Sequence, residues 1–184
     1  MTERTSSQVV FGIAIAIALG AFVSWAGSDG GDRVGVVPVF AICGALAFAI
    51  NWLVFIPSAL VQSEHYYDLT GGITYITVTV AAVYLASDLD LRAKLVAAMV
   101  IVWSARLASF LFLRISKAGK DSRFDNIKNR PARFFLAWTL QGLWVLLTAG
   151  TAFAVITGSK TAPLGIVGYV GIVVWAVGML FEIM

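Results

Sequence analysis

Long apolar runs separated by short polar segments set the pattern of this chain. Each run is near or above the roughly 18 residues that a helix needs to cross the hydrocarbon core of a bilayer. Runs that are apolar throughout, rather than alternating, are typical of membrane-spanning helices and not of barrel strands. The sequence therefore predicts an all-α polytopic transmembrane helical bundle of about six spans, at residues 9–26, 37–61, 69–86, 95–115, 134–157 and 164–184.

The composition agrees with a membrane protein and excludes several other classes. Hydrophobic residues make up 60% of the 184 residues and charged residues only 12%, whereas a soluble domain carries roughly 25% charged residues. A disordered chain, a disulfide scaffold and a nucleic-acid-binding protein do not fit these values, and the single Cys43 has no partner for an internal disulfide. Because no internal repeat divides the chain, residues 1–184 are interpreted as one integral-membrane domain in a lipid bilayer.

The distribution of basic residues predicts the orientation of the spans. The segment Arg114–Arg133 holds seven of the 13 Lys and Arg residues, and loops rich in these residues stay on the cytoplasmic side. Placing this loop and the N-terminus in the cytoplasm leaves eight basic residues inside and four outside, and the opposite orientation reverses that ratio. We therefore expect both the N-terminus and the basic loop to be cytoplasmic.

Polar side chains inside the apolar runs are the first candidates for a functional site. A charged residue at the centre of a span costs about 2.5–3.5 kcal/mol on insertion scales, so its presence needs a reason. Arg106 lies near the middle of the fourth span, Gln141 in the fifth and Glu182 in the sixth. Because Tyr67 and Asp68 lie at the cytoplasmic mouth of the third span, four helices are expected to bring polar groups into one pocket that opens to the cytoplasm.

Structural roles for these and other residues stay open. Arg106 is expected to lie close to a carboxylate of another helix, either Asp68 or Glu182, and such a pair also holds a bundle together. Taken singly, Gln141 and Asn51 are better explained as hydrogen bonds between helices. Close packing against a neighbouring helix is predicted for the glycines of the last span, Gly165, Gly168, Gly171 and Gly178.

No metal site is predicted, because the sole histidine, His65, lacks partners at the spacing of metal ligands. The basic loop, in contrast, has features beyond those of an anchoring segment. Gly119 allows a tight turn, Asp121 and Arg123 are spaced to hold each other, and a guanidinium group presents a two-pronged donor to phosphate. The loop could serve only to fix orientation or to bind anionic lipid headgroups. Its chemistry also suits a clamp for a phosphorylated cofactor.

Several spaced motifs resemble the bacterial membrane family related to the steroid 5-alpha-reductases. They are Trp103-x-x-Arg106-Leu107, then Arg114, then Gly119-Lys120-Asp121-Ser122-Arg123-Phe124, then Gln141-Gly142. Two further blocks, Tyr66-Tyr67-Asp68-Leu69-Thr70-Gly71 and Gly178-Met179-Leu180-Phe181-Glu182, also look like family segments. The resemblance covers residue 51 to the last residue, with Lys120 in place of the usual acidic residue and Phe124 in place of the usual Tyr.

The resemblance implies an NADPH-dependent reductase, in the inner membrane of a bacterium, that reduces a C=C bond of a lipid-soluble enone. Tyr67 and Asp68 are the candidates for the catalytic, substrate-side residues. The cofactor-side residues implied by position are Arg106, Arg114, Asp121, Arg123, Gln141 and Glu182. Hydride would go to the β-carbon while an acid polarises the carbonyl.

A third departure from the family pattern is larger than the substitutions at Lys120 and Phe124. The family continues past the position of Glu182 into an Arg-His-Pro-Asn-Tyr-like block, which these 184 residues do not contain. We therefore expect a truncated or diverged member that by itself binds NADPH weakly and shows no measurable enone reduction. Two other classes remain as alternatives: a methyltransferase of the wider superfamily acting on a lipidic substrate, and a non-catalytic membrane protein that keeps the bundle.

Overall fold

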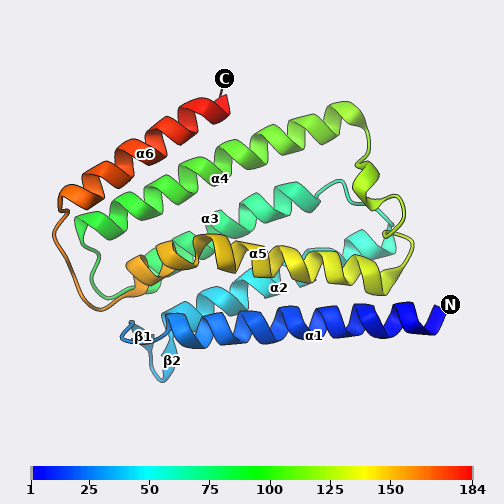
Figure 1. The fold of residues 1–184 in the computed structure, drawn as a ribbon, viewed down its shortest axis with the longest axis horizontal. Helices are drawn as coiled ribbons and strands as arrows, with labels where there is room; N and C mark the ends of the chain where they lie inside the picture. Colours follow the sequence, from blue (N-terminus) through cyan, green and yellow to red (C-terminus); the bar gives the residue numbers. More distant parts are fainter. Residues whose placement is uncertain (1, 184) are drawn as a thin grey trace.

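The computed structural model describes the backbone of residues 2–183 and the side chains of residues 6–182. Within this part of the chain, six helices run back and forth along one common direction (Figure 1). They are α1 (Thr2–Gly27), α2 (Val39–Leu60), α3 (Tyr67–Leu85), α4 (Leu91–Ala118), α5 (Pro131–Thr157) and α6 (Ile166–Ile183). A 3-10 turn at Ser122–Phe124 lies between α4 and α5.

The helices confirm the predicted all-α membrane bundle. Helices α1 to α5 each contain a segment that is long and apolar enough to cross a bilayer, including the Thr- and Val-rich α3. Helix α6 is equally apolar but shorter, with 18 residues. The segment after α1 forms a small antiparallel hairpin of β1 (Arg33–Val34) and β2 (Val37–Pro38).

Helix α5 is the centre of the bundle, since it contacts α1, α2, α3 and α4. Half of its buried residues, such as Leu146 and Phe153, pack with α2 residues, including Phe40, in the main apolar core. Asn51 of α2, fully buried, donates a hydrogen bond to the hydroxyl of Thr74 on α3 at 3.3 Å. This bond confirms the helix-joining role predicted for Asn51.

Two adjacent glycines bring α3 against its neighbours. A Cβ atom added at Gly72 would lie 2.2 Å from the Cβ of Ala108 on α4, and one added at Gly71 would lie 2.7 Å from the amide nitrogen of Gln141 on α5. A side chain at Gly72 would therefore push α4 away, because packed interiors leave no room for an extra methyl group. A side chain at Gly71 would displace the end of the Gln141 side chain instead.

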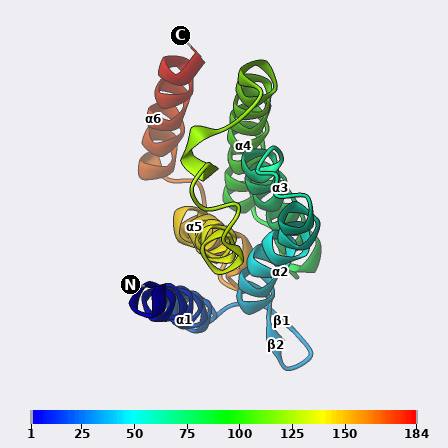
Figure 2. The same cartoon turned by 90° about the vertical axis from the view of Figure 1, so that its right-hand side faces the viewer.

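Helix α6 stands apart from the other five helices (Figure 2). Its apolar residues are largely exposed along its whole length. Among the described residues, a Cβ added at Gly165, Gly171 or Gly178 would meet no atom within 4 Å, and at Gly168 it would meet only Leu164, which precedes the helix. The prediction that these glycines pack α6 closely against another helix is therefore wrong for contacts within this chain.

Candidate functional site

The loop between α4 and α5 is folded back onto the loop between α2 and α3. Gly119 ends α4 in the left-handed conformation, with φ of 79°, as the predicted tight turn requires. Glu64 then joins the two loops, because its carboxylate accepts the backbone N–H of Asp121 at 3.1 Å and the Nζ of Lys128 at 3.0 Å. The side chain of Phe124 is buried beside Phe134 and Trp138. The basic loop is thus a packed cover over one end of the bundle.

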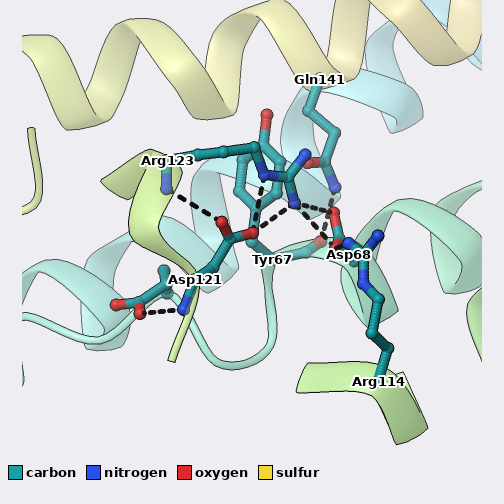
Figure 3. A network of polar contacts seen from close by, with 7 residues as sticks. Tyr67, Asp68, Arg114, Asp121, Arg123 and Gln141 are labelled. Atoms are coloured by element: carbon teal, nitrogen blue, oxygen red, sulfur yellow. Dashed lines mark hydrogen bonds and ion pairs between the residues drawn. The ribbon is translucent and has the colours of Figure 1, made fainter. Parts of the chain in front are cut away.

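Arg123 is the centre of an ion-pair network on the inner side of this cover (Figure 3). Its Nε donates to the carboxylate of Asp121 at 2.7 Å, and its Nη2 donates both to Asp121 and to the two carboxylate oxygens of Asp68, at 3.0 and 3.2 Å. The Nη2 atom of Arg114, near the end of α4, lies 3.6 Å from the Oδ2 atom of Asp68. The prediction that Asp121 and Arg123 hold each other is confirmed, and Asp68 of α3 is added to the pair.

Hydrogen bonds shift the pKa values of three charged groups in the two loops, Glu64, Asp121 and Arg123. The side-chain hydrogen bonds from Arg123 outweigh burial and hold the pKa of Asp121 below its ordinary value, and the same bonds raise the pKa of Arg123. Burial opposes ionisation of Glu64, but hydrogen bonds from Asp121 and Lys128 outweigh it and lower the pKa of that carboxyl. All three groups are therefore charged at neutral pH.

One hydrogen-bond donor of Arg123 has no acceptor within the described residues. The Nη1 atom of Arg123 makes no hydrogen bond with any side chain or backbone group of residues 6–182, and the arginine side chain is 56% exposed. Arg114 is 49% exposed. The two guanidinium groups thus face carboxylates on one side and are accessible on the other, as a phosphate-binding group must be.

Tyr67 and Gln141 connect this network to α5. The amide of Gln141 donates to the backbone carbonyl of Tyr67 at 2.8 Å, which bears out its predicted role as a link between helices. The hydroxyl of Tyr67 donates to the backbone carbonyl of Ala137 at 3.0 Å. To donate a proton to a substrate, this hydroxyl would have to leave Ala137.

A cavity of about 380 Å³ extends from the network into the bundle between α3, α4 and α5. Its mouth includes Asp68 and Arg123, and its deeper wall is mainly apolar and aromatic, with Tyr75, Trp103 and Trp144. Volumes of about 300–1,000 Å³ and apolar walls with a few polar groups are typical of small-molecule sites. Four predicted site residues, Tyr67, Asp68, Arg123 and Gln141, line this one cavity.

Arg106 and Glu182 lie elsewhere and pair with each other. The predicted pairing of Arg106 with a carboxylate of another helix is therefore confirmed, but the prediction that four helices share one pocket is wrong. Arg106 is two residues from both Ser104 and Ala108, which are buried against the bundle. Because a helix turns about 100° per residue, Arg106 faces about 200° away from those residues and towards α6. Neither side chain of the pair is buried, at 24% and 45% exposed.

Sequence reasoning missed the two residues that hold the cover in place, Glu64 and Lys128. Glu64 is 5% exposed and Lys128 24%. They are 64 positions apart in the sequence, and each is one charged residue among others in a polar loop. No local pattern distinguishes them, since the pairing depends on how the two loops meet.

The comparisons with known proteins give one result. Residues 54–184 match the family described as "Protein of unknown function (DUF1295)". The chain belongs to the DUF1295 family. No curated protein and no solved structure matches the chain. The DUF1295 match begins within α2 and includes every residue of the Arg123 network and of the cavity below it.

Proposed function

We propose that this DUF1295 protein is a membrane-embedded reductase of the steroid 5-alpha-reductase type, which uses NADPH to reduce a C=C bond of a lipid-soluble enone. The main support for this proposal is that the guanidinium group of Arg123 is exposed, with its Nη1 donor unpaired within residues 6–182, at the mouth of an apolar cavity. Such a site provides donors for the phosphates of a cofactor and, next to them, an apolar space for a lipid-soluble substrate. The motif resemblance supports the choice of NADPH and of an enone.

The residues of the site have separate roles in this proposal. Arg123 and Arg114 bind cofactor phosphates, and Asp68 and Asp121 hold the two guanidinium groups in position. The apolar wall binds the substrate and excludes water. Tyr67 is the candidate proton donor, since a phenol carries a proton at neutral pH and Tyr67 lines the cavity. NADPH would supply the hydride that is added to the β-carbon of the enone.

Titration of the purified protein with NADPH, followed by the change in fluorescence, tests the cofactor site. We expect Arg123→Ala to weaken binding by about 10- to 150-fold, because hydrogen bonds to charged groups contribute about 1.5–3 kcal/mol. Arg123→Lys keeps the positive charge but loses the two-pronged donor of the guanidinium group, and we expect this variant to bind NADPH less tightly than the native protein. Lys117→Ala is the matched control, since it removes one basic residue from the exposed end of α4 without touching the network.

The outcomes separate the possibilities. Micromolar NADPH binding that Arg123→Ala abolishes would show that these residues form a complete cofactor site. Weak binding that Arg123→Ala weakens further, and Lys117→Ala does not, supports the same location and agrees with the weak affinity expected from the sequence. Equal effects of the two alanine variants would refute a phosphate site at Arg123 and favour non-specific attraction to the basic loop.

A further inference from the structure

A second cavity, of about 550 Å³, lies between α4, α5 and α6. Its wall is largely apolar and includes Met99, Trp175 and Met179, while Glu182 contributes the charged group. It shares Trp103 and Trp144 with the first cavity, so the two indole rings separate the two spaces. The Arg123 network does not reach this second cavity, whose lining comes from other residues.

Helix α6 is held to the bundle at its two ends and not between them. Before the helix begins, the backbone N–H of Ala162 donates to the carboxylate of Asp90 at 2.9 Å. Near the other end, Glu182 pairs with Arg106. Between these points, no hydrogen bond joins a described residue of α6 to another helix. The cavity is therefore the space beneath a helix that is fixed only at its ends.

The size of this space indicates what kind of molecule fits. A volume of about 550 Å³ is within the range of small-molecule sites, about 300–1,000 Å³. A further spanning helix, about 10 Å wide and 30 Å long, would occupy roughly 2,400 Å³. The cavity fits a small molecule, and its side position in the bundle, under a helix whose apolar residues face outward, suits a molecule that arrives from the bilayer.

The polar groups at this cavity favour a ligand with a hydrogen-bond acceptor. The indole N–H of Trp175 makes no hydrogen bond within residues 6–182. Glu182, the charged group of the wall, already pairs with Arg106. A carbonyl oxygen accepts and does not donate, so it matches the open indole N–H.

We propose that the cavity between α4, α5 and α6 is a binding site for a lipophilic ketone taken sideways from the bilayer, and that it is the access route by which the enone reaches the first cavity past Trp103 and Trp144. The binding site stands on the geometry of this cavity alone. Its role as an access route rests on the proposed reductase function.

Photolabelling tests the site without any turnover. The probe is a cyclohexenone with a long alkyl chain that carries a diazirine, added to the full chain in phosphatidylcholine vesicles, irradiated, and mapped by mass spectrometry. We expect labels on the cavity-lining residues of α4 and α6. Gly178→Phe should reduce this labelling by roughly tenfold or more, because Gly178 lines the cavity and has open space for a side chain, so Phe fills the volume that the probe needs.

Gly171→Phe is the matched control. Gly171 lies two turns earlier on the same face of α6, also has open space, and is not part of the cavity wall. Val100→Phe fills the same cavity from α4 and should reproduce the effect of Gly178→Phe, which keeps the test valid if one variant fails to fold. Uniform labelling of outward-facing residues, or equal loss in Gly171→Phe and Gly178→Phe, would overturn the proposal.

The result is independent of the cofactor test. Labelling of the cavity in a protein that does not bind NADPH would support the lipid site and leave the reductase function refuted. NADPH binding that requires Arg123, together with labelling that Gly178→Phe does not change, would support the cofactor site and refute this access route.

Discussion

Glu64→Ala removes the carboxylate that joins the cover to the α2–α3 loop. The substitution leaves the backbone N–H of Asp121 without its acceptor and Lys128 without its partner. A buried donor left unpaired costs about 1–3 kcal/mol. The loss of Lys128 pairing adds less than the 3–5 kcal/mol of a fully buried pair, because Lys128 is 24% exposed and can turn towards water. We therefore expect the cover to be destabilised locally by about 2–4 kcal/mol.

Hydrogen exchange followed by mass spectrometry measures this local stability. A loss of about 2–4 kcal/mol corresponds to exchange about 30- to 900-fold faster in peptides that cover residues 119–130, if the cover opens as a unit. Glu64→Gln keeps an oxygen that can accept the Asp121 N–H but loses the charge facing Lys128, so its effect should lie between those of the native protein and Glu64→Ala.

Asp125→Ala is the control in the same loop. It breaks the ion pair of Lys120 and Asp125, whose side chains are 67% and 38% exposed. Exposed pairs contribute about 0–1 kcal/mol, so exchange should rise by no more than about fivefold. If Glu64→Ala changed exchange no more than Asp125→Ala, the argument that the buried carboxylate holds the cover would be refuted.

Two further predictions concern pH and helix packing. Because the pKa values of Glu64 and Asp121 are lowered in the folded chain, their stabilisation of the cover is present above the ordinary carboxyl pKa of about 4 and lost as the pH falls through the lowered values. A spin label at Ser122 should stay immobile from neutral pH to about pH 4 and become mobile only below it, and mobility that already rises near pH 6 would contradict this assignment. Gly72→Ala should lower the thermal stability by about 1–3 kcal/mol, because the new Cβ would lie 2.2 Å from the Cβ of Ala108. An unchanged unfolding midpoint in detergent would show that α3 and α4 can move apart freely.

The helices could be predicted because membrane spanning depends on a property that is visible in any window of the chain. Mean apolarity located all six helices, and the largest differences are extensions of α1, α4 and α5, so that α4 begins at Leu91 rather than at residue 95. The added turns are polar or charged, and apolarity alone cannot detect them. There the helix start depends on a cap instead: the side chain of Asp90 accepts the N–H of Ala93 at 2.7 Å.

The site was predictable only where its geometry is local. Asp121 and Arg123 are two positions apart, so their pairing follows from spacing. The contact of Arg123 with Asp68, 55 positions away, depends on how the loops meet. The placement of Arg106 was not predictable in this way, because only the packed structure shows that Ala108 is on the buried face of α4 and that Arg106, two residues earlier, is on the opposite face. The packing of the α6 glycines was not predictable, since a row of small residues permits close contact without requiring it.

The charges around the mouth of the first cavity indicate which end of a bound ligand would lie at the mouth and which would lie deeper. The Arg123 network is balanced, with two guanidinium groups and two carboxylates, so it can be built beside an apolar cavity without an uncompensated charge. The wider region is not balanced: the segment Arg114–Arg133 carries seven basic and two acidic residues, and Glu64 of the α2–α3 loop and Asp68 of α3 add two negative charges. The excess of three positive charges raises the local concentration of anions at the mouth, while the cavity below it is apolar. A ligand with phosphates at one end and a weakly polar ring at the other therefore suits this site better than a neutral lipid or a fully charged metabolite. The contrast between a positively charged mouth and an apolar interior is the physical basis for proposing NADPH at Arg123 and an uncharged enone deeper in the bundle.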